Sequence, residues 1–397
     1  MNHQFRGFIR PIIGVLIFLT ILLYYAGLNW GLNAIGFMVL FNLLFVVTFS
    51  IDLGRTMFNR PEMLLFLIFL LLSFVAVFYP DIDYESFNFT ITKILAAFMG
   101  AYIAIALVQI LDLEDYFHFG FIIALLLIIY AEYSAGTFKP MTFYAPTASR
   151  HDFLYNANYY SYMGLFASFS IFRLHLKYRN AWTFAGLVLI PLSAIAIAFT
   201  AQTRSGLIFV ILVNALFWFW VNKPKKKNPI YSIFRKLLLL GISLFLTFQF
   251  INIYTNSSIE NRLSSTSAKE ESRGYLIKKG IEVFIDHPFT GVGPGNFINY
   301  NKRRQMSHNN YVEALVEHGI FIGPIILLVF LLPFYKSFKL YVTNKSNPEY
   351  KLSLLFFGIF LLFNNIYVFY RASNAMMYFF VMLGIHYRFL DNKNQST

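Results

Sequence analysis

The sequence contains no cysteine, which excludes disulfide bonds and thiolate metal sites. It is also poor in charge: 13% of its residues are Asp, Glu, Lys or Arg, about half the share of roughly 25% in a soluble globular protein. Apolar residues take their place, with 58% of the chain hydrophobic and a mean hydropathy of +0.58. These proportions exclude an ordinary soluble domain and indicate a protein whose surroundings are largely lipid.

Acidic residues are scarcer than basic ones, 19 against 32, which leaves a net charge of +13. In a soluble protein such an excess would suggest a nucleic-acid partner. Cytoplasmic loops of membrane proteins are rich in Lys and Arg for a different reason, the positive-inside rule. That rule accounts for the excess here, so we expect no nucleic acid among the partners.

Apolar runs long enough for a helix to cross a bilayer, about 20 residues, recur along the chain. Runs such as "LLFLIFLLLSFVAVF" do not alternate apolar and polar residues as membrane strands would. The sequence therefore predicts an all-α, polytopic integral membrane protein with about twelve transmembrane helices. The expected spans are 11–28, 32–51, 62–79, 91–111, 117–134, 159–175, 182–200, 205–221, 236–254, 318–335, 352–370 and 374–389.

The distribution of basic residues orients these spans. If the N-terminus is cytoplasmic, the basic clusters fall on the cytoplasmic side at 6–10, 55–60, 173–179, 223–227, 336–351 and 388–393. Only the "DLEDY" turn at 112–116 is acidic on that side. We therefore expect both termini in the cytoplasm, and the loop at 255–310 on the outer face together with the turns that hold Arg204 and Arg371.

The chain divides into spans 1–9 at 1–254, a large outer loop at 255–310, and spans 10–12 with a short cytoplasmic tail at 311–397. Loops of such length tend to be functional or disordered. From Arg273 onward the loop predicts an amphipathic helix on the outer membrane surface, since one helical face gathers the apolar residues Leu276, Ile277, Gly280, Ile281 and Phe284. The following "HPFTGVGPGNF" at 287–297 breaks that helix.

Outer arginines are candidate anion ligands, because the planar guanidinium suits phosphate. Arg273 lies in the apolar stripe of the predicted helix, Arg204 precedes a span in "FTAQTRSG", and Arg371 lies in "YRASN" between the last two spans. Each could equally be an interfacial anchor that snorkels to headgroups, and Arg150 is better explained by solvent exposure. Several outer arginines on one bundle suggest a polyanion. Because nucleotides are scarce outside the cytoplasm, a lipid-linked diphosphate is the obvious candidate.

His308 follows the glycine-rich break, and histidine has an ordinary pKa of ~6.5 that suits a general base near neutral pH. The simpler explanation is a polar residue at the start of a helix. If a helix runs from about 308, its spacing directs Glu313 and Glu317 away from the imidazole, so a His–Glu catalytic pair is not predicted. The acids of "DID" at 81–83 are best explained as a solvated turn, and we expect no metal and no cofactor.

Three stretches together resemble the bacterial O-antigen ligase/polymerase membrane proteins. They are "QTRSG" before a span, "SRGYLIKKGIEVFIDHPFTGVGPGNF" in the large outer loop, and "HNNYVEALVEHGIFIG" leading into the next span. Each motif is short and degenerate by itself, but the order and spacing of the three motifs are specific to this family. The resemblance covers about residues 150–335, whereas the first spans carry only generic hydrophobicity.

The resemblance implies a metal-independent, GT-C-like glycosyltransferase of the bacterial cytoplasmic membrane, with a polyprenyl (undecaprenyl) diphosphate-linked glycan as donor. By this resemblance Arg204 and Arg273 would bind the diphosphate, and His308 would be the base on the acceptor hydroxyl. Arg371, as a third outer arginine, is a further candidate ligand of the diphosphate. The loop that would support the site contributes Gly291, Gly293, Gly295 and Asn309.

Three functions fit these features. The first is a polymerase that joins lipid-linked repeat units into O-antigen or capsule, and the second is a ligase that moves finished glycan onto lipid A core or another acceptor. The third is a flippase or exporter, which would place ionisable residues near the midplane of the spans. The candidates here cluster at the outer rim, which favours an enzyme. The expected partners are the polyprenyl-diphosphate-linked oligosaccharide, a glycan acceptor and the bilayer, and a flippase or chain-length regulator would fit as a protein partner.

Overall fold

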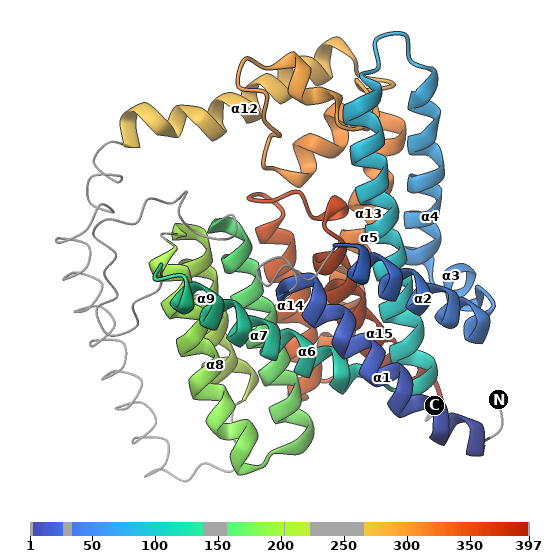
Figure 1. Cartoon of the computed structure of the whole chain (residues 1–397), viewed down its shortest axis with the longest axis vertical. Coiled ribbons are helices and arrows are strands. Elements are labelled where there is room, and N and C mark those ends of the chain that lie inside the picture. Colours follow the sequence, from blue (N-terminus) through green and yellow to red (C-terminus); the bar gives the residue numbers. More distant parts are fainter. Residues whose placement is uncertain (1–2, 27–33, 138–156, 202, 223–265, 396–397) are drawn as a thin grey trace.

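The computed structural model describes residues 3–26, 34–137, 157–201, 203–222 and 266–395, and in this part all regular secondary structure is helical. The thirteen α-helices of this part, labelled as in Figure 1, are α1 (His3–Ala26), α2 (Ala34–Asp52), α3 (Arg55–Asn59), α4 (Pro61–Ser73), α5 (Tyr84–Leu111), α6 (Glu114–Ser134), α7 (Ala157–Tyr178), α8 (Ala181–Thr200), α9 (Arg204–Leu216), α12 (Thr266–Asp286), α13 (Asn310–Thr343), α14 (Pro348–Phe363) and α15 (Ser373–Gln395). Shorter helical turns are η1 (Phe74–Phe78), η2 (Phe217–Val221), η3 (Asn296–Tyr300) and η4 (Phe369–Arg371).

Eleven of the twelve expected spans coincide with helices of the described residues, and the one expected at 236–254 lies outside them. Six helices of the described part are long and apolar enough to cross a membrane, namely α1, α4 with η1, α5, α6, α8 and α13. The chain is therefore a polytopic membrane protein, whereas a total of twelve spans stays a prediction.

Helix α5 is the central element of the bundle. All residues from Ala101 to Val108 are fully buried, as expected for a helix that is apolar all round. Its most extensive contact is with α15, and small residues permit the close approach. A Cβ atom on Gly384 would lie 2.9 Å from the Val108 side chain. Around this pair, α4 packs on α13, α1 packs on α6, and α7 packs on α8 and α9.

Helix α12 crosses one end of the bundle at a steep angle to the long helices (Figure 1). It begins at Thr266, earlier than the periodicity from Arg273 indicated. Its buried face is also narrower than predicted, because Ile281, expected on that face, is 48% exposed. Gly280 permits the contact with α13, since a Cβ atom there would lie 2.5 Å from Val312. A small second core joins α12 to the following loop and α13 through Val283, Val292, Phe297 and Val316.

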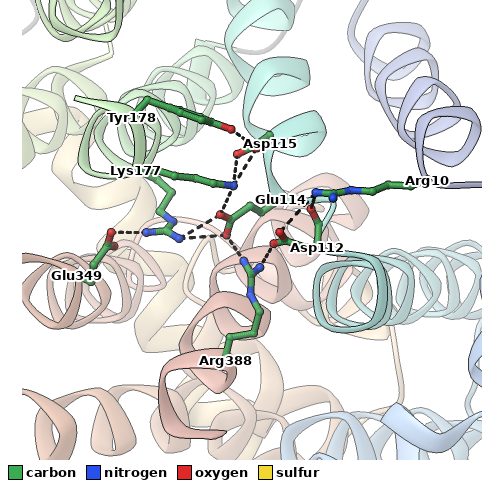
Figure 2. Close-up of polar contacts among 9 residues, drawn as sticks. Arg10, Asp112, Glu114, Asp115, Lys177, Tyr178, Glu349 and Arg388 are labelled. Carbon is green, nitrogen blue, oxygen red and sulfur yellow. Dashed lines mark hydrogen bonds and ion pairs between the residues drawn. The ribbon is translucent and has the colours of Figure 1, made fainter. Parts of the chain in front are cut away.

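The opposite end of the bundle holds a network of ion pairs around the "DLEDY" turn between α5 and α6 (Figure 2). Glu114 is 1% exposed and pairs with Arg173 at 3.1 Å and Lys177 at 2.9 Å, and also with Arg388. Arg10 and Arg388 pair with Asp112, Lys177 pairs with Asp115, and Arg173 also pairs with Glu349. The acidic turn is thus neutralised by basic side chains of α1, α7 and α15.

Candidate functional site

The loop from residue 287 to residue 309 docks onto a break in α13. Gly319 has φ 66° and ψ −175°, which interrupts the helix. Because Ile320 N–H donates to the Pro288 carbonyl at 2.8 Å, it does not close the helical bond to Val316. The loop supplies the missing donors: Val292 N–H reaches the Val316 carbonyl and Gly293 N–H reaches the Glu317 carbonyl, both at 2.9 Å. The break and the loop therefore complete each other's backbone hydrogen bonds.

Two glycines let the loop approach its neighbours this closely. Gly291 has φ 67°, and a Cβ atom there would lie 2.5 Å from the Glu317 carbonyl carbon. Gly295 has φ 78°, and its Cβ atom would lie 2.4 Å from the Ser86 carbonyl oxygen at the start of α5. A side chain at either position would collide with backbone in a conformation that glycine alone adopts readily. The loop is thus wedged between α13 and α5.

The "DID" turn is the part of the α5 end that receives this loop. Asn296 donates through Nδ2 to the Asp81 carbonyl at 3.1 Å, and Asn299 donates to the Asp83 carboxylate at 3.2 Å. Asp83 also caps α5 by accepting from Glu85 N–H at 3.1 Å. Hydrogen bonds from Ser86 and Asn299 hold the pKa of the exposed Asp83 carboxyl below its usual range. Asp83 thus caps α5, and the turn holds the loop at 287–309 against this helix.

His308 lies immediately before α13, which begins at Asn310 rather than at about 308. It is half-buried and has φ 55°, a left-handed conformation that is uncommon for a residue other than glycine. Asn309 is the N-cap of α13, and its Oδ1 accepts from Tyr311 N–H at 3.0 Å and from Val312 N–H at 3.1 Å. Ser307 Oγ donates to the Asn309 carbonyl at 2.9 Å. The residues on both sides of His308 are therefore fixed.

Arg371 lies in η4 and approaches the same segment from the turn between α14 and α15. Its Nη2 lies 3.1 Å from Glu313 Oε1 and 2.9 Å from the Tyr370 hydroxyl, and it also pairs with Glu317. Both glutamates are fully or almost fully buried. The charge of this arginine is thus balanced inside the protein by Glu313 and Glu317.

Arg273 has the opposite surroundings. It is exposed near the middle of α12 and has no carboxylate partner among the described residues. It continues the helical row of Leu276, Gly280 and Val283, which are buried against the loop and α13. In Figure 1 the N-terminal half of α12 extends toward the side of the molecule that holds α7, α8 and α9. Because no described carboxylate pairs with Arg273, it stays a candidate ligand for an anion.

Arg204 is the first residue of α9, as expected of a helix start, and its side chain lies outside the part of the chain that the structure describes. The neighbouring helices show at which end of the bundle Arg204 lies. Lys177, near the end of α7, pairs with Glu114 in the ion-pair network of Figure 2. Helix α8 then packs along α7 and returns to the other end of the bundle. Arg204 therefore lies at the same end as α12 and His308. That these three residues line one cavity stays a prediction.

Two residues near the site were not identified from sequence. Lys93, in the N-terminal half of α5, has no carboxylate partner among the described residues, and its Nζ lies 3.8 Å from the centroid of the Phe89 ring. In the sequence, Lys93 is marked only as a single lysine within an apolar run. The second is Glu313, which contacts the backbone of Ser307 rather than an imidazole. No sequence pattern indicates that contact.

Metal ligation has no obvious basis in this region: within the described ranges, no three His, Asp or Glu side chains lie together as ligands of an ion would. The end of the bundle that holds α12 offers instead Arg273 and Lys93, which have no carboxylate partners among the described residues, and a histidine held in a left-handed conformation.

In a comparison with known protein families, residues 187–328 match the model of a family described as O-antigen ligase. The matched range contains Arg204, Arg273 and His308, whereas Lys93 and Arg371 lie outside it. No match is found among curated proteins. Together with its apolar helices, the match indicates a helical membrane protein whose residues 187–328 are similar to the O-antigen ligase family.

Proposed function

We propose that this protein is a glycosyltransferase that takes a glycan from a polyprenyl diphosphate carrier and joins repeat units into a surface polysaccharide. The family match supports a glycan-joining enzyme. The observation that carries the proposal is the left-handed conformation of His308, which is held on both sides by hydrogen bonds. Backbone strain that the surroundings enforce is typical of functional positions.

The chemistry needs a base at one end and a stabilised leaving group at the other. His308 accepts the proton of the acceptor hydroxyl as its oxygen attacks the anomeric carbon of the donor sugar. The bond from that carbon to the phosphate oxygen breaks, and the diphosphate leaves with the negative charge. Arg204 and Arg273 bind this diphosphate and stabilise the charge as it develops. Because the arginines fill the role a metal ion has in other phosphate chemistry, the reaction is metal-independent.

Arg371, the third arginine expected at the diphosphate, has a different part in this proposal. Two buried carboxylates already balance its charge, and its Nη1 contacts the sulfur of Met306 at 3.9 Å. We assign it mainly to the architecture around His308. The loop with Gly291, Gly293, Gly295 and Asn309 has the same supporting role, since it joins α13 to α5 beside the histidine.

The site belongs, in this proposal, to the outer face of the bacterial cytoplasmic membrane, with both termini in the cytoplasm. The ion-pair network around Glu114 then lies at the cytoplasmic end, where the positive-inside rule expects the basic residues of α7 and α15. Donor glycans displayed on the outer leaflet would reach the arginines without crossing the bilayer.

A ligase that transfers finished glycan to lipid A core or another acceptor is the second candidate, because the matched family is described by that activity. Deletion of the gene in its native host distinguishes the two. Loss of a polymerase leaves single repeat units on the final acceptor, whereas loss of a ligase leaves long glycan on the lipid carrier.

The test of the catalytic proposal is His308→Ala expressed in the deletion strain. Transfer from lipid-linked glycan extracted from that strain should fall by about two to four orders of magnitude, because the base is removed. Binding of undecaprenyl diphosphate to the purified protein should persist through the arginines. His287→Ala is the matched control, since His287 is an exposed histidine of the same loop, and it should transfer normally. Near-normal transfer by His308→Ala would show that the histidine is only an interfacial residue.

A further inference from the structure

Glu313 has two partners that connect it to the segment before His308. Its Oε2 accepts a hydrogen bond from Ser307 N–H at 2.7 Å, and its Oε1 lies 3.1 Å from Arg371 Nη2. The side chain is fully buried. We propose that Glu313, held by Arg371, is a positioning residue that sets the place of His308 by fixing the backbone before it. The inference rests on the proposed role of His308 as the base.

The first step of the argument is that each carboxylate oxygen has its own partner. A buried carboxylate needs both charge compensation and hydrogen bonds to be stable. Arg371 provides the charge, with a side chain that is 8% exposed. The backbone N–H of Ser307 provides a hydrogen bond to the ionised group, a strong kind of hydrogen bond. Ser307 therefore cannot move away without leaving a buried carboxylate oxygen without a donor.

The second step concerns the conformation of His308. A φ of 55° on a residue with a side chain is disfavoured and persists only when the surroundings enforce it. The Ser307–Glu313 bond fixes the residue before the histidine, and the N-cap bonds of Asn309 fix the residue after it. With both neighbours held, the backbone of His308 and the direction of its Cα–Cβ bond are set. A carboxylate can thus serve the histidine without touching its ring.

The third step links this arrangement to the last two spans. Asn310 N–H donates to the Asn364 carbonyl at 2.8 Å, and Asn310 Oδ1 accepts from Phe369 N–H at 2.9 Å. These bonds and the Glu313–Arg371 pair attach the start of α13 to η4. The turn between α14 and α15 is therefore part of the frame that holds His308, although it lies outside the matched family range.

Glu317 provides a matched comparison. It is also buried and pairs with Arg371, but its other contacts are with the Tyr370 hydroxyl at 3.2 Å and with the backbone of Gly295, not with Ser307. Glu313→Gln and Glu317→Gln remove the same charge from the same arginine without leaving a cavity. Only the first disturbs the bond to the histidine segment, because a glutamine cannot accept from both Ser307 N–H and Arg371.

The experiment measures transfer from lipid-linked glycan extracted from the deletion strain, with purified variants in detergent. Glu313→Ala should lower kcat by about 10- to 100-fold, the scale expected when a catalytic group is displaced by about 1 Å. The KM for the donor and the affinity for undecaprenyl diphosphate should stay within about threefold of wild type, since the arginines bind it. Glu313→Gln should lose less than Glu313→Ala but more than Glu317→Gln, and it guards against an alanine variant that fails to fold.

A double-mutant cycle with His308→Ala separates positioning from general destabilisation. If Glu313 acts through His308, adding Glu313→Gln to His308→Ala should lower the residual rate by less than about twofold. A full additional loss in that background, or equal losses for Glu313→Gln and Glu317→Gln, would overturn the positioning role. An unimpaired His308→Ala variant would overturn the proposed function itself, so the two failures are distinguishable.

Discussion

At the scale of the residue, Arg371 and Arg273 differ in the partners of their guanidinium groups. Arg371 faces two buried glutamates and a tyrosine hydroxyl, so an incoming phosphate would compete with partners already in place. Arg273 has no carboxylate partner among the described residues. Guanidinium groups without internal partners keep their hydrogen-bond donors for a ligand. The sequence makes these arginines look equivalent, and only their partners separate a ligand from a structural cation.

Replacing Arg273 with Ala should weaken binding of undecaprenyl diphosphate by about tenfold or more, since a charge-assisted hydrogen bond contributes roughly 1.5–3 kcal/mol. Arg273→Lys should recover part of the affinity, because an ammonium keeps the charge but loses the bidentate fork. The measurement is a binding titration on purified protein. Lys279→Ala is the control. It removes a cation of the same helix that already pairs with Glu282, so this variant should bind normally. Equal losses in the two variants would point to a diffuse charge effect.

At the scale of the element, the defining feature is the pairing of a broken helix with a glycine-rich loop. The break at Gly319 frees backbone groups of α13, and the loop satisfies them with its own. Membrane proteins tolerate non-helical backbone only where protein or water provides such partners. The same loop contacts α5 through Gly295 and Asn299. These contacts give the histidine segment a rigid base.

Gly291→Ala should destabilise this element by about 1–3 kcal/mol, the cost of a strained left-handed residue, since Gly291 has φ 67° and its Cβ atom would meet the Glu317 carbonyl. The unfolding temperature in detergent should fall, and transfer should fall with it as the histidine segment loosens. Gly274→Ala in α12 is the matched control, because a Cβ atom there meets nothing within 4 Å and alanine favours a helix. An unchanged unfolding temperature for Gly291→Ala would contradict the docking of the loop at 287–309 onto the break in α13.

At the scale of the whole molecule, the charged groups separate into two ends. One end carries the network around Glu114, in which each of four carboxylates pairs with at least one of four basic side chains (Figure 2). The other end carries Arg273 and Lys93, which have no carboxylate partner among the described residues, together with His308. Between them lies the apolar bundle around α5 and α15. Stability and proposed chemistry should therefore respond to different substitutions.

Glu114→Gln should destabilise the fold by about 3–5 kcal/mol, the cost of breaking a buried ion pair, because Arg173, Lys177 and Arg388 all contact this carboxylate. The unfolding temperature and the yield of folded protein should fall. Transfer per folded molecule should change by less than about twofold, since the site lies at the other end. Glu282→Gln, at an exposed i,i+3 pair with Lys279, should be neutral in both measurements. A specific loss of transfer in folded Glu114→Gln would show that the two ends are coupled.

Local sequence was enough to predict the class, the helices and the family. Apolar run length and charge composition identified a polytopic helical membrane protein, and eleven expected spans coincide with helices of the described residues. The order of three motifs predicted the family that residues 187–328 match. Helix limits were less accurate: the span expected at 318–335 is only part of α13, which runs from Asn310 to Thr343. Hydropathy detects only the apolar part of a helix, whereas the polar first turns are stabilised by the Asn309 cap and by buried partners.

The tertiary structure alone decided the surroundings of each charged group. Glu313 and Arg371 are 58 residues apart in the chain, and Glu114 and Arg388 are 274 apart, so no periodicity within one helix could pair them. Spacing did not indicate a pairing of Glu313 with the imidazole, and it could not indicate the bond to Ser307 N–H. The physical reason is that composition and periodicity report local preferences, whereas ion pairs in a low-dielectric interior depend on which helices the fold brings together.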